Sequence, residues 1–204
     1  GVSEGHCASW NFGERHLDTA ENILQNYEIL GQVLGAGTDQ MVTSAQTHTT
    51  NIKVVTGADR GKGVIRDRDY ADIDGLVTDE RNIAIITGHA DCNAIFFFDP
   101  VKQVIGLAHS GWRGTLAGIS AAMTLKMEQE YGCSPSDIIA GIGPSLCQDC
   151  FEVDEDVAQA FLEADEGNRQ FCERRGCKTH IDLKGIIRRD LHAAGLKPGN
   201  LSDM

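Results

Sequence analysis

One cysteine and two histidines of this chain have side chains that bind soft metal ions, and their context suggests that they lie close together. They are His48 in the tripeptide QTH, Cys92 in ADC and His109 at the end of VIGLAH. The segments IAIITGHADC and VIGLAH are apolar enough for buried strands, and each ends at one of these residues. A short hairpin through Asp99-Pro100 would place Cys92 and His109 at the same edge of one sheet.

These three residues predict a catalytic metal centre, with His48, Cys92 and His109 as both ligands and catalytic groups. A thiolate and two imidazoles suit zinc or copper, whereas magnesium and calcium prefer oxygen ligands. Zinc is the first choice, because three protein ligands leave a fourth position for water or substrate. Asp91 would be the partner that orients a ligand. Two alternatives remain open from the residues alone: a hydrolase in which Cys92 attacks and His109 is its base, and an ordinary buried cysteine beside unrelated histidines.

Length and composition favour one soluble domain. The chain has 204 residues, 41% of them hydrophobic, and a formal net charge of -12. This charge argues against a nucleic-acid surface, and no apolar run is long enough to cross a membrane. The seven cysteines are an odd number in a chain with enough core to fold without disulfides. We therefore expect a reduced, cytoplasmic protein with a single domain over residues 1–204, trimmed at both ends.

Helical and strand patterns alternate along the chain and predict an α/β fold. Short apolar runs such as NIAIITG, AIFFFD and VIGLAH predict a sheet that is covered on both faces. The polar, glycine-rich segment from Arg60 to Asp74 is typical of a surface loop or a lid. Helices are predicted over residues 18–34, 114–131, 154–164 and 182–195.

Several motifs occur in an order that resembles one known family. They are QTH, DGLVTD, ADC, FFFDPVKQVIGLAHSGWRGT, IGPSLCQDCFEV and HIDL. With them the chain resembles the YfiH-like, or laccase-domain, family of purine nucleoside phosphorylases, formerly called multicopper polyphenol oxidoreductases. The resemblance covers essentially the whole chain, although relatives carry an N-terminal strand and a C-terminal segment beyond its limits.

The resemblance implies a fold and an activity. The fold would be a single three-layer α/β/α sandwich with a mixed central sheet, and zinc would be bound by His48, Cys92 and His109. The implied activities are phosphorolysis of adenosine, inosine and methylthioadenosine, together with adenosine deamination. Its partners would then be purine nucleosides and phosphate, with no nucleic acid and no membrane.

Arg113, four residues beyond His109, is the candidate for the phosphate contact. A guanidinium can hold phosphate through two hydrogen bonds, and Gly111 and Gly114 leave room for a ligand. The alternative is an Arg113 paired with a carboxylate beside a packed Trp112. His89 departs from the family pattern, and we expect it to make a local hydrogen bond.

The other cysteines suggest weaker sites. Cys147 and Cys150 form a CxxC motif that could be redox-active, and with Cys172 and Cys177 they could form a four-thiolate zinc site of irregular spacing.

Two other function classes are open besides a nucleoside enzyme. A copper-dependent polyphenol oxidase would need several copper centres, but the seven histidines are scattered and none forms an HxH pair. A binding protein with a relic site would hold no metal.

Overall fold

A six-stranded mixed sheet is the centre of the computed structural model, which describes residues 1–13 and 17–203. The four central strands β7, β5, β6 and β3 run antiparallel, and each edge strand runs parallel to its neighbour. The strand order across the sheet is β11 (Leu201–Asp203), β7 (Ile139–Ile142), β5 (Asn93–Asp99), β6 (Val104–Ser110), β3 (Gly75–Thr78) and β2 (Ile52–Val54). The predicted α/β fold with a mixed sheet is confirmed.

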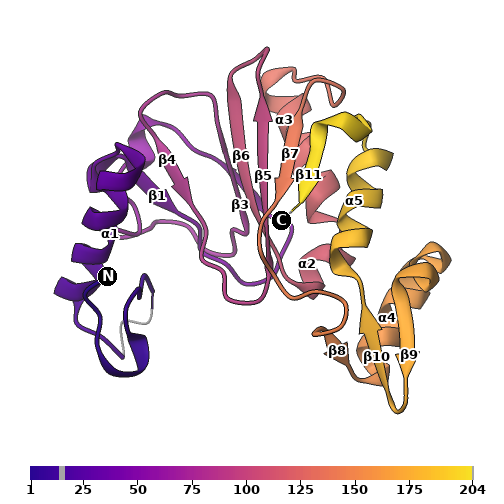
Figure 1. Ribbon diagram of the computed structural model, residues 1–204. Coiled ribbons are helices and arrows are strands. Elements are labelled where there is room, and N and C mark those ends of the chain that lie inside the picture. The colour runs from indigo at the N-terminus through magenta and orange to yellow at the C-terminus, as the bar shows by residue number, and fades with distance from the viewer. Residues whose placement is uncertain (14–16, 204) are drawn as a thin grey trace.

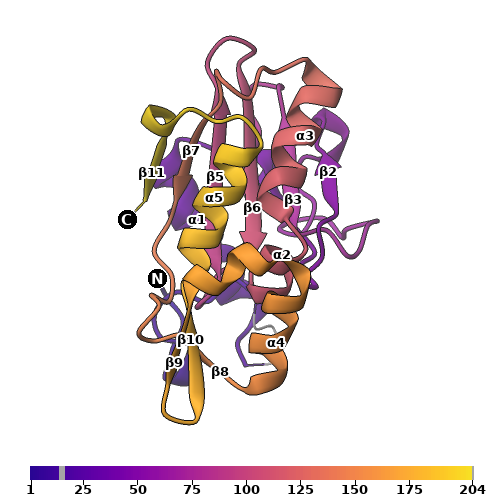
Figure 2. The ribbon, with the colours of Figure 1, turned by 90° about the vertical axis from the view of Figure 1, so that its right-hand side faces the viewer.

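Helices lie on both sides of this sheet (Figures 1 and 2). α3 (Ile119–Tyr131) and α5 (Leu183–Ala193) cover one face. Their apolar side chains, including Met123, Met127 and Ile187, form the main core with the β-strands. On the other side lie α1 (Ala20–Leu34) and a separate parallel pair, β1 (Met41–Thr43) with β4 (Ala84–Ile86). The arrangement is therefore three layers.

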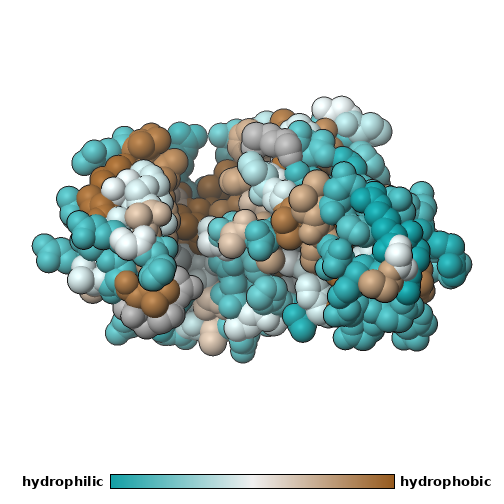
Figure 3. Space-filling model, turned by 60° about the horizontal axis from the view of Figure 1, so that its bottom comes forward, coloured by the Kyte–Doolittle hydropathy of each residue, from teal (hydrophilic) through white to brown (hydrophobic). Residues whose placement is uncertain are grey.

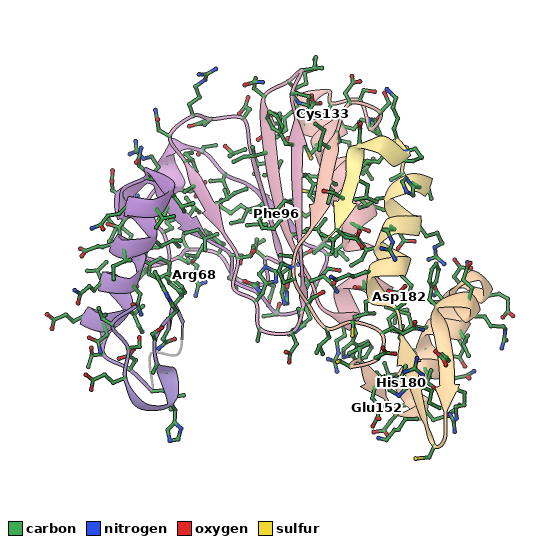
Figure 4. The ribbon with its side chains drawn as sticks, viewed as in Figure 1. Arg68, Phe96, Cys133, Glu152, His180 and Asp182 are labelled. Atoms are coloured by element: carbon green, nitrogen blue, oxygen red, sulfur yellow. The ribbon has the colours of Figure 1, made fainter. Side chains whose placement is uncertain are left out.

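The second face of the sheet is only partly covered. A hollow of about 450 Å³ separates it from α1 and β4. Phe96 lines this hollow and is 51% exposed, and it points to that side in Figure 4. Figure 3 shows the same depression with apolar side chains at its floor.

A smaller layer lies in the sequence between β7 and α5, and its strands were not predicted. It consists of the antiparallel strands β8 (Glu152–Val153), β10 (Lys178–Ile181) and β9 (Cys172–Arg175), packed against α4 (Glu155–Ala164). Its core is a separate cluster around Phe161 and Ile181. The β9 sequence CERR is charged and lacks the alternation by which strands are found, which explains why it was missed.

The prediction of one continuous helix over residues 114–131 is wrong, because the structure has two helices there. α2 (Trp112–Leu116) ends before Gly118, whose φ of 79° is left-handed, and α3 then begins at Ile119. A residue with positive φ cannot continue an α-helix, so the chain turns there. The 3-10 helices are Gly5–Cys7, Thr38–Gln40, Gly57–Asp59, Glu166–Phe171 and Pro198–Asn200.

The remaining predicted helices are present with small changes at their ends. α1 is capped by Thr19, whose side chain accepts a hydrogen bond from the Asn22 N–H at 3.1 Å. α5 ends before Gly195, which has a φ of 103°. None of the helices in the described ranges has the length and apolar content that a membrane crossing requires.

Candidate metal centre

The β5–β6 hairpin brings Cys92 and His109 together. Ala94 is paired with His109 and Asn93 with Ser110, so the residue before β5 lies next to the end of β6. Cys92 is that residue. The prediction that Cys92 ends the preceding strand is wrong, since β4 already ends at Ile86. The expected edge is nevertheless correct, because the hairpin, and not the earlier strand, positions the thiol.

His48 reaches the same edge from a loop after β1. Its backbone has a φ of 66°, in the left-handed region that non-glycine residues rarely adopt. The Asp74 carboxylate holds this loop, because it accepts hydrogen bonds from the backbone N–H groups of Thr47, His48 and Thr49 at 3.0, 3.0 and 2.8 Å. Three such bonds to one buried carboxylate fix the position from which the imidazole extends.

Asp74 also orients the second histidine. Its Oδ1 lies 2.8 Å from Nδ1 of His109, and both side chains are buried. The N–H hydrogen bonds lower the pKa of Asp74 against the opposing effect of burial, so the carboxylate is ionised and His109 Nδ1 donates. Nε2 of His109 is then left with its lone pair for a metal ion. The expected orienting residue, Asp91, is exposed instead.

The three ligand groups converge closely enough to hold one ion. Their donor atoms all lie within 4.8 Å of one another, the only such group of metal-binding side chains in the described part of the chain. Tetrahedral zinc with these ligands separates its donor atoms by about 3.5 Å. Small side-chain rotations would therefore complete the coordination, so the donor set and its geometry fit a metal.

Gly111 makes this convergence sterically feasible. A Cβ at this position would lie 2.7 Å from Cδ2 of His48 and 3.0 Å from Sγ of Cys92. The first distance is shorter than side-chain contacts allow, so any larger residue would displace a ligand.

The surroundings shift the pKa of the His109 imidazole down and the pKa of the Cys92 thiol up. Burial, partly offset by Asp74, lowers the pKa of His109 and keeps its ring neutral, as metal binding requires. Burial raises the pKa of Cys92, and Asp91 and Asp74 raise it further. The thiol is therefore protonated without a metal and must lose a proton to bind one.

A larger cavity opens beside the cluster. Its volume is about 770 Å³, and aromatic side chains, one guanidinium and one imidazole line it: Trp10, Phe12, Tyr27, Arg68 and His89. The His89 ring centroid lies 5.2 Å from that of His109, so one residue of the cavity wall is a neighbour of the cluster. As expected, His89 makes a local hydrogen bond, to Thr87 Oγ1 at 2.7 Å.

The two arginines near the site differ in their surroundings. Arg113 is exposed and lies over the Trp112 ring, with its Cζ 4.1 Å from the ring centroid. It makes no ion pair with any carboxylate of the described residues, so the alternative of a paired Arg113 is wrong. Arg68 lines the cavity and donates to the Ser44 carbonyl and Thr43 Oγ1. Figure 4 shows it between α1 and the central strands. It lies in the segment predicted as a lid and was not singled out.

The four-thiolate site is not formed. Cys147, Cys150, Cys172 and Cys177 are all free thiols, and within the described ranges they do not make a metal-binding group. Cys177 lies in the exposed turn between β9 and β10, while Cys172 is partly buried against Phe161 and its neighbours.

Comparison with known proteins agrees with the fold and with the motifs. Residues 1–204 match the family model described as multi-copper polyphenol oxidoreductase laccase. The chain is 34% identical over 210 residues to the purine nucleoside phosphorylase YlmD of Bacillus subtilis, covering 99% of this chain and 73% of that protein. It is also 34% identical over 189 residues to adenosine deaminase RL5 of an unknown prokaryotic organism, covering 90% of this chain and 71% of that protein.

A solved structure is similar over the full chain. The crystal structure of the Bacillus licheniformis hypothetical protein YfiH superposes with a TM-score of 0.92 at 32% identity, covering 100% of this chain and 78% of that one. The expected resemblance is confirmed, and the chain belongs to the YfiH-like family of multi-copper polyphenol oxidoreductase laccases, several of whose members are named as purine nucleoside phosphorylases.

Proposed function

We propose that the protein is a zinc-dependent purine nucleoside enzyme that cleaves adenosine, inosine and methylthioadenosine with phosphate and also deaminates adenosine. The observation that carries the proposal is the cluster of His48, Cys92 and His109 beside a cavity with aromatic walls, whose lining residue His89 neighbours His109. Relatives that are named for these two activities support it.

The cavity suits a nucleoside in size and lining. Its volume of about 770 Å³ is in the range that holds small ligands. Trp10 and Phe12 are stacked with ring centroids 5.4 Å apart, and Trp10 is 47% exposed. An exposed aromatic face can stack on a purine, which is a favourable and sequence-tolerant contact. Gln46 and Thr87, which also line the cavity, offer hydrogen bonds to the polar edge of the base.

The protein's own groups would bind and orient the reactants. A bound zinc ion would supply Lewis-acid polarisation and lower the pKa of water. His48, Cys92 and His109 would hold the ion, and Asp74 would keep the His109 ring in its orientation. Arg113 remains the proposed phosphate contact, with Arg68 as a second cation that already faces the cavity.

A copper-dependent phenol oxidase is the second candidate, because the family description favours it. Reduction of oxygen to water takes several copper ions working together. The described residues gather one metal-binding group, which argues for the nucleoside reaction.

Metal analysis and a product assay test the proposal together. The purified protein is analysed for zinc and copper and is then incubated with adenosine, with and without phosphate. We expect bound zinc, adenine that forms only with phosphate, and inosine in both reactions. Cys92→Ala should abolish all products. A zinc-loaded protein that releases neither adenine nor inosine, or one that instead oxidises phenols with bound copper, would overturn the proposal.

A further inference from the structure

The CxxC segment lies in an exposed turn between β7 and β8, away from the metal ligands in the sequence. Cys147 and Cys150 are both exposed free thiols. The Cys150 N–H donates to the Cys147 carbonyl at 3.1 Å, and the Phe151 N–H donates to the same oxygen at 2.9 Å. This hydrogen bond between residues i+3 and i defines a β-turn, in which the two Cα atoms lie less than about 7 Å apart. That distance is compatible with a disulfide.

The two thiols also influence each other's ionisation. The backbone N–H and the thiol of Cys150, together with the Asp149 N–H, lower the pKa of the Cys147 thiol, and Cys147 in turn raises the pKa of the Cys150 thiol. A sulfur that accepts several hydrogen bonds is stabilised as a thiolate, which is the nucleophilic form.

Neighbouring residues hold the turn in this shape. His180 Nδ1 lies 3.2 Å from the Gln148 carbonyl, and Arg175 forms an ion pair with Asp149 at 2.6 Å. On the other side, the Leu146 N–H donates to the Asp91 carbonyl at 3.2 Å. His180 lies in β10 and is labelled in Figure 4. The two thiols are therefore preorganised by contacts on both flanks.

We propose that Cys147 and Cys150 are a redox-active dithiol that exchanges with small-molecule disulfides. Cys147 is the attacking thiol and Cys150 the resolving thiol. Hydrogen bonds from Cys150 and from the turn lower the pKa of Cys147, and the pKa of Cys150 is raised by the same contact. This difference gives each thiol its role.

The exchange is balanced in two steps. The Cys147 thiolate attacks one sulfur of the small disulfide, its S–S bond breaks, and one small thiolate leaves. The Cys150 thiol then loses its proton and attacks the Cys147 sulfur of the mixed disulfide, and the second small thiolate leaves. The protein is oxidised by two electrons, the small disulfide is reduced to two thiols, and the two protons lost by the protein are taken up by those products.

Oxidised glutathione is a suitable probe for the test. The zinc-loaded full chain is incubated with it, quenched in acid, denatured and alkylated, and its peptides are analysed by mass spectrometry. We expect the protein to lose two alkylatable thiols, Cys147 and Cys150, and to yield a peptide in which they are linked. Cys177→Ser is the matched control, because it removes an exposed thiol from a neighbouring turn, and it should leave this result unchanged.

Two further variants separate the roles of the thiols. Cys150→Ser should trap glutathione on Cys147 as a stable mixed disulfide, whereas Cys147→Ser should leave Cys150 mostly free. Circular dichroism checks that each variant is folded. The proposal is overturned if both thiols remain alkylatable in excess oxidised glutathione, or if Cys147 pairs with Cys172 or Cys177 instead. These measurements do not involve nucleoside turnover, so their outcome is independent of the proposed function.

Discussion

Two regions of this molecule contain cysteines whose surroundings shift the pKa of the thiol in opposite directions. Cys92 lies between two imidazoles at a sheet edge, and burial raises the pKa of its thiol. Cys147 lies in an exposed turn, and hydrogen bonds lower the pKa of its thiol. We propose that the same residue type serves a metal site in one place and thiol–disulfide exchange in the other. Burial and neighbouring donors, and not the motif alone, determine the chemistry.

Replacing each of these two cysteines with alanine should give the largest difference between the two regions. Cys92→Ala removes a proposed metal ligand, so we expect loss of zinc and a fall in nucleoside phosphorolysis on the order of a thousandfold, which corresponds to several kcal/mol of lost stabilisation. Cys147→Ala should keep both zinc and activity. Zinc content and kcat/KM measure the difference. Equal loss in both variants would show that the two regions are not distinct.

Removal of the charge that orients His109 should have the next largest effect. Asp74→Asn weakens the hold on His109 and on the His48 loop, and we expect zinc affinity to fall by about 10 to 100-fold. Asp72→Asn is the matched control, because this exposed carboxylate accepts from Thr47 Oγ1 at 2.9 Å in the same loop but touches neither ligand. Competition with a chromophoric chelator measures both affinities. If the two variants bind zinc with similar affinity, Asp74 does not position the ligands.

The raised pKa of Cys92 predicts how metal binding depends on pH. The thiol is protonated at neutral pH and the thiolate is the ligand, so binding releases a proton and becomes stronger as pH rises. His109 adds little to this dependence, because its lowered pKa already keeps it neutral. Zinc affinity should rise about tenfold per pH unit between about pH 6 and 8. Calorimetry in buffers of different ionisation enthalpy measures the released proton, and a pH-independent affinity would contradict the assignment.

A methyl group at Gly111 tests whether the cluster is as tight as its geometry indicates. Gly111→Ala would push against His48 and Cys92, and we expect zinc affinity to fall by about tenfold because the ligands lose their alignment. Gly114→Ala is the control, since its nearest neighbour would lie at 3.5 Å, an ordinary contact. If Gly111→Ala binds zinc as tightly as Gly114→Ala, the ligands have more room than described.

The two arginines give the smallest and most specific contrast. Arg113→Ala should raise the KM for phosphate several-fold while the KM for the nucleoside stays constant, since an exposed guanidinium contributes less than a buried one. Arg68→Ala tests the other cation. An unchanged phosphate KM in Arg113→Ala would end its assignment, and an increase in Arg68→Ala alone would place the anion inside the cavity.

The sequence predicted the parts of the site that depend on local pattern. The ligand types and the turn at Asp99-Pro100 were enough to place Cys92 and His109 at one edge. Asp74 was missed, although an acidic residue directly before a buried strand is an unusual signal. Its role depends on three backbone groups and a histidine from distant segments, and spacing does not report such contacts.

In the fold, too, the elements with a clear local pattern were predicted and the others were missed. Apolar runs predicted the central sheet and amphipathic spacing predicted most helices. The charged strands of the small layer and the break at Gly118 were not found, because both depend on tertiary packing that overrides local preference. The cavity was also out of reach, since its walls come from residues 10–90 and only the fold brings them together.

The contacts of Asp74 have a consequence for how the protein is made. Its carboxylate bonds to residues 26 positions before it and 35 positions after it. During synthesis the His48 loop therefore leaves the ribosome well before its last partner, and the centre cannot assemble until the β6 strand has followed. Cys92 leaves the ribosome after the His48 loop and before His109, so in a newly made chain its thiol stays without its neighbours until the hairpin closes.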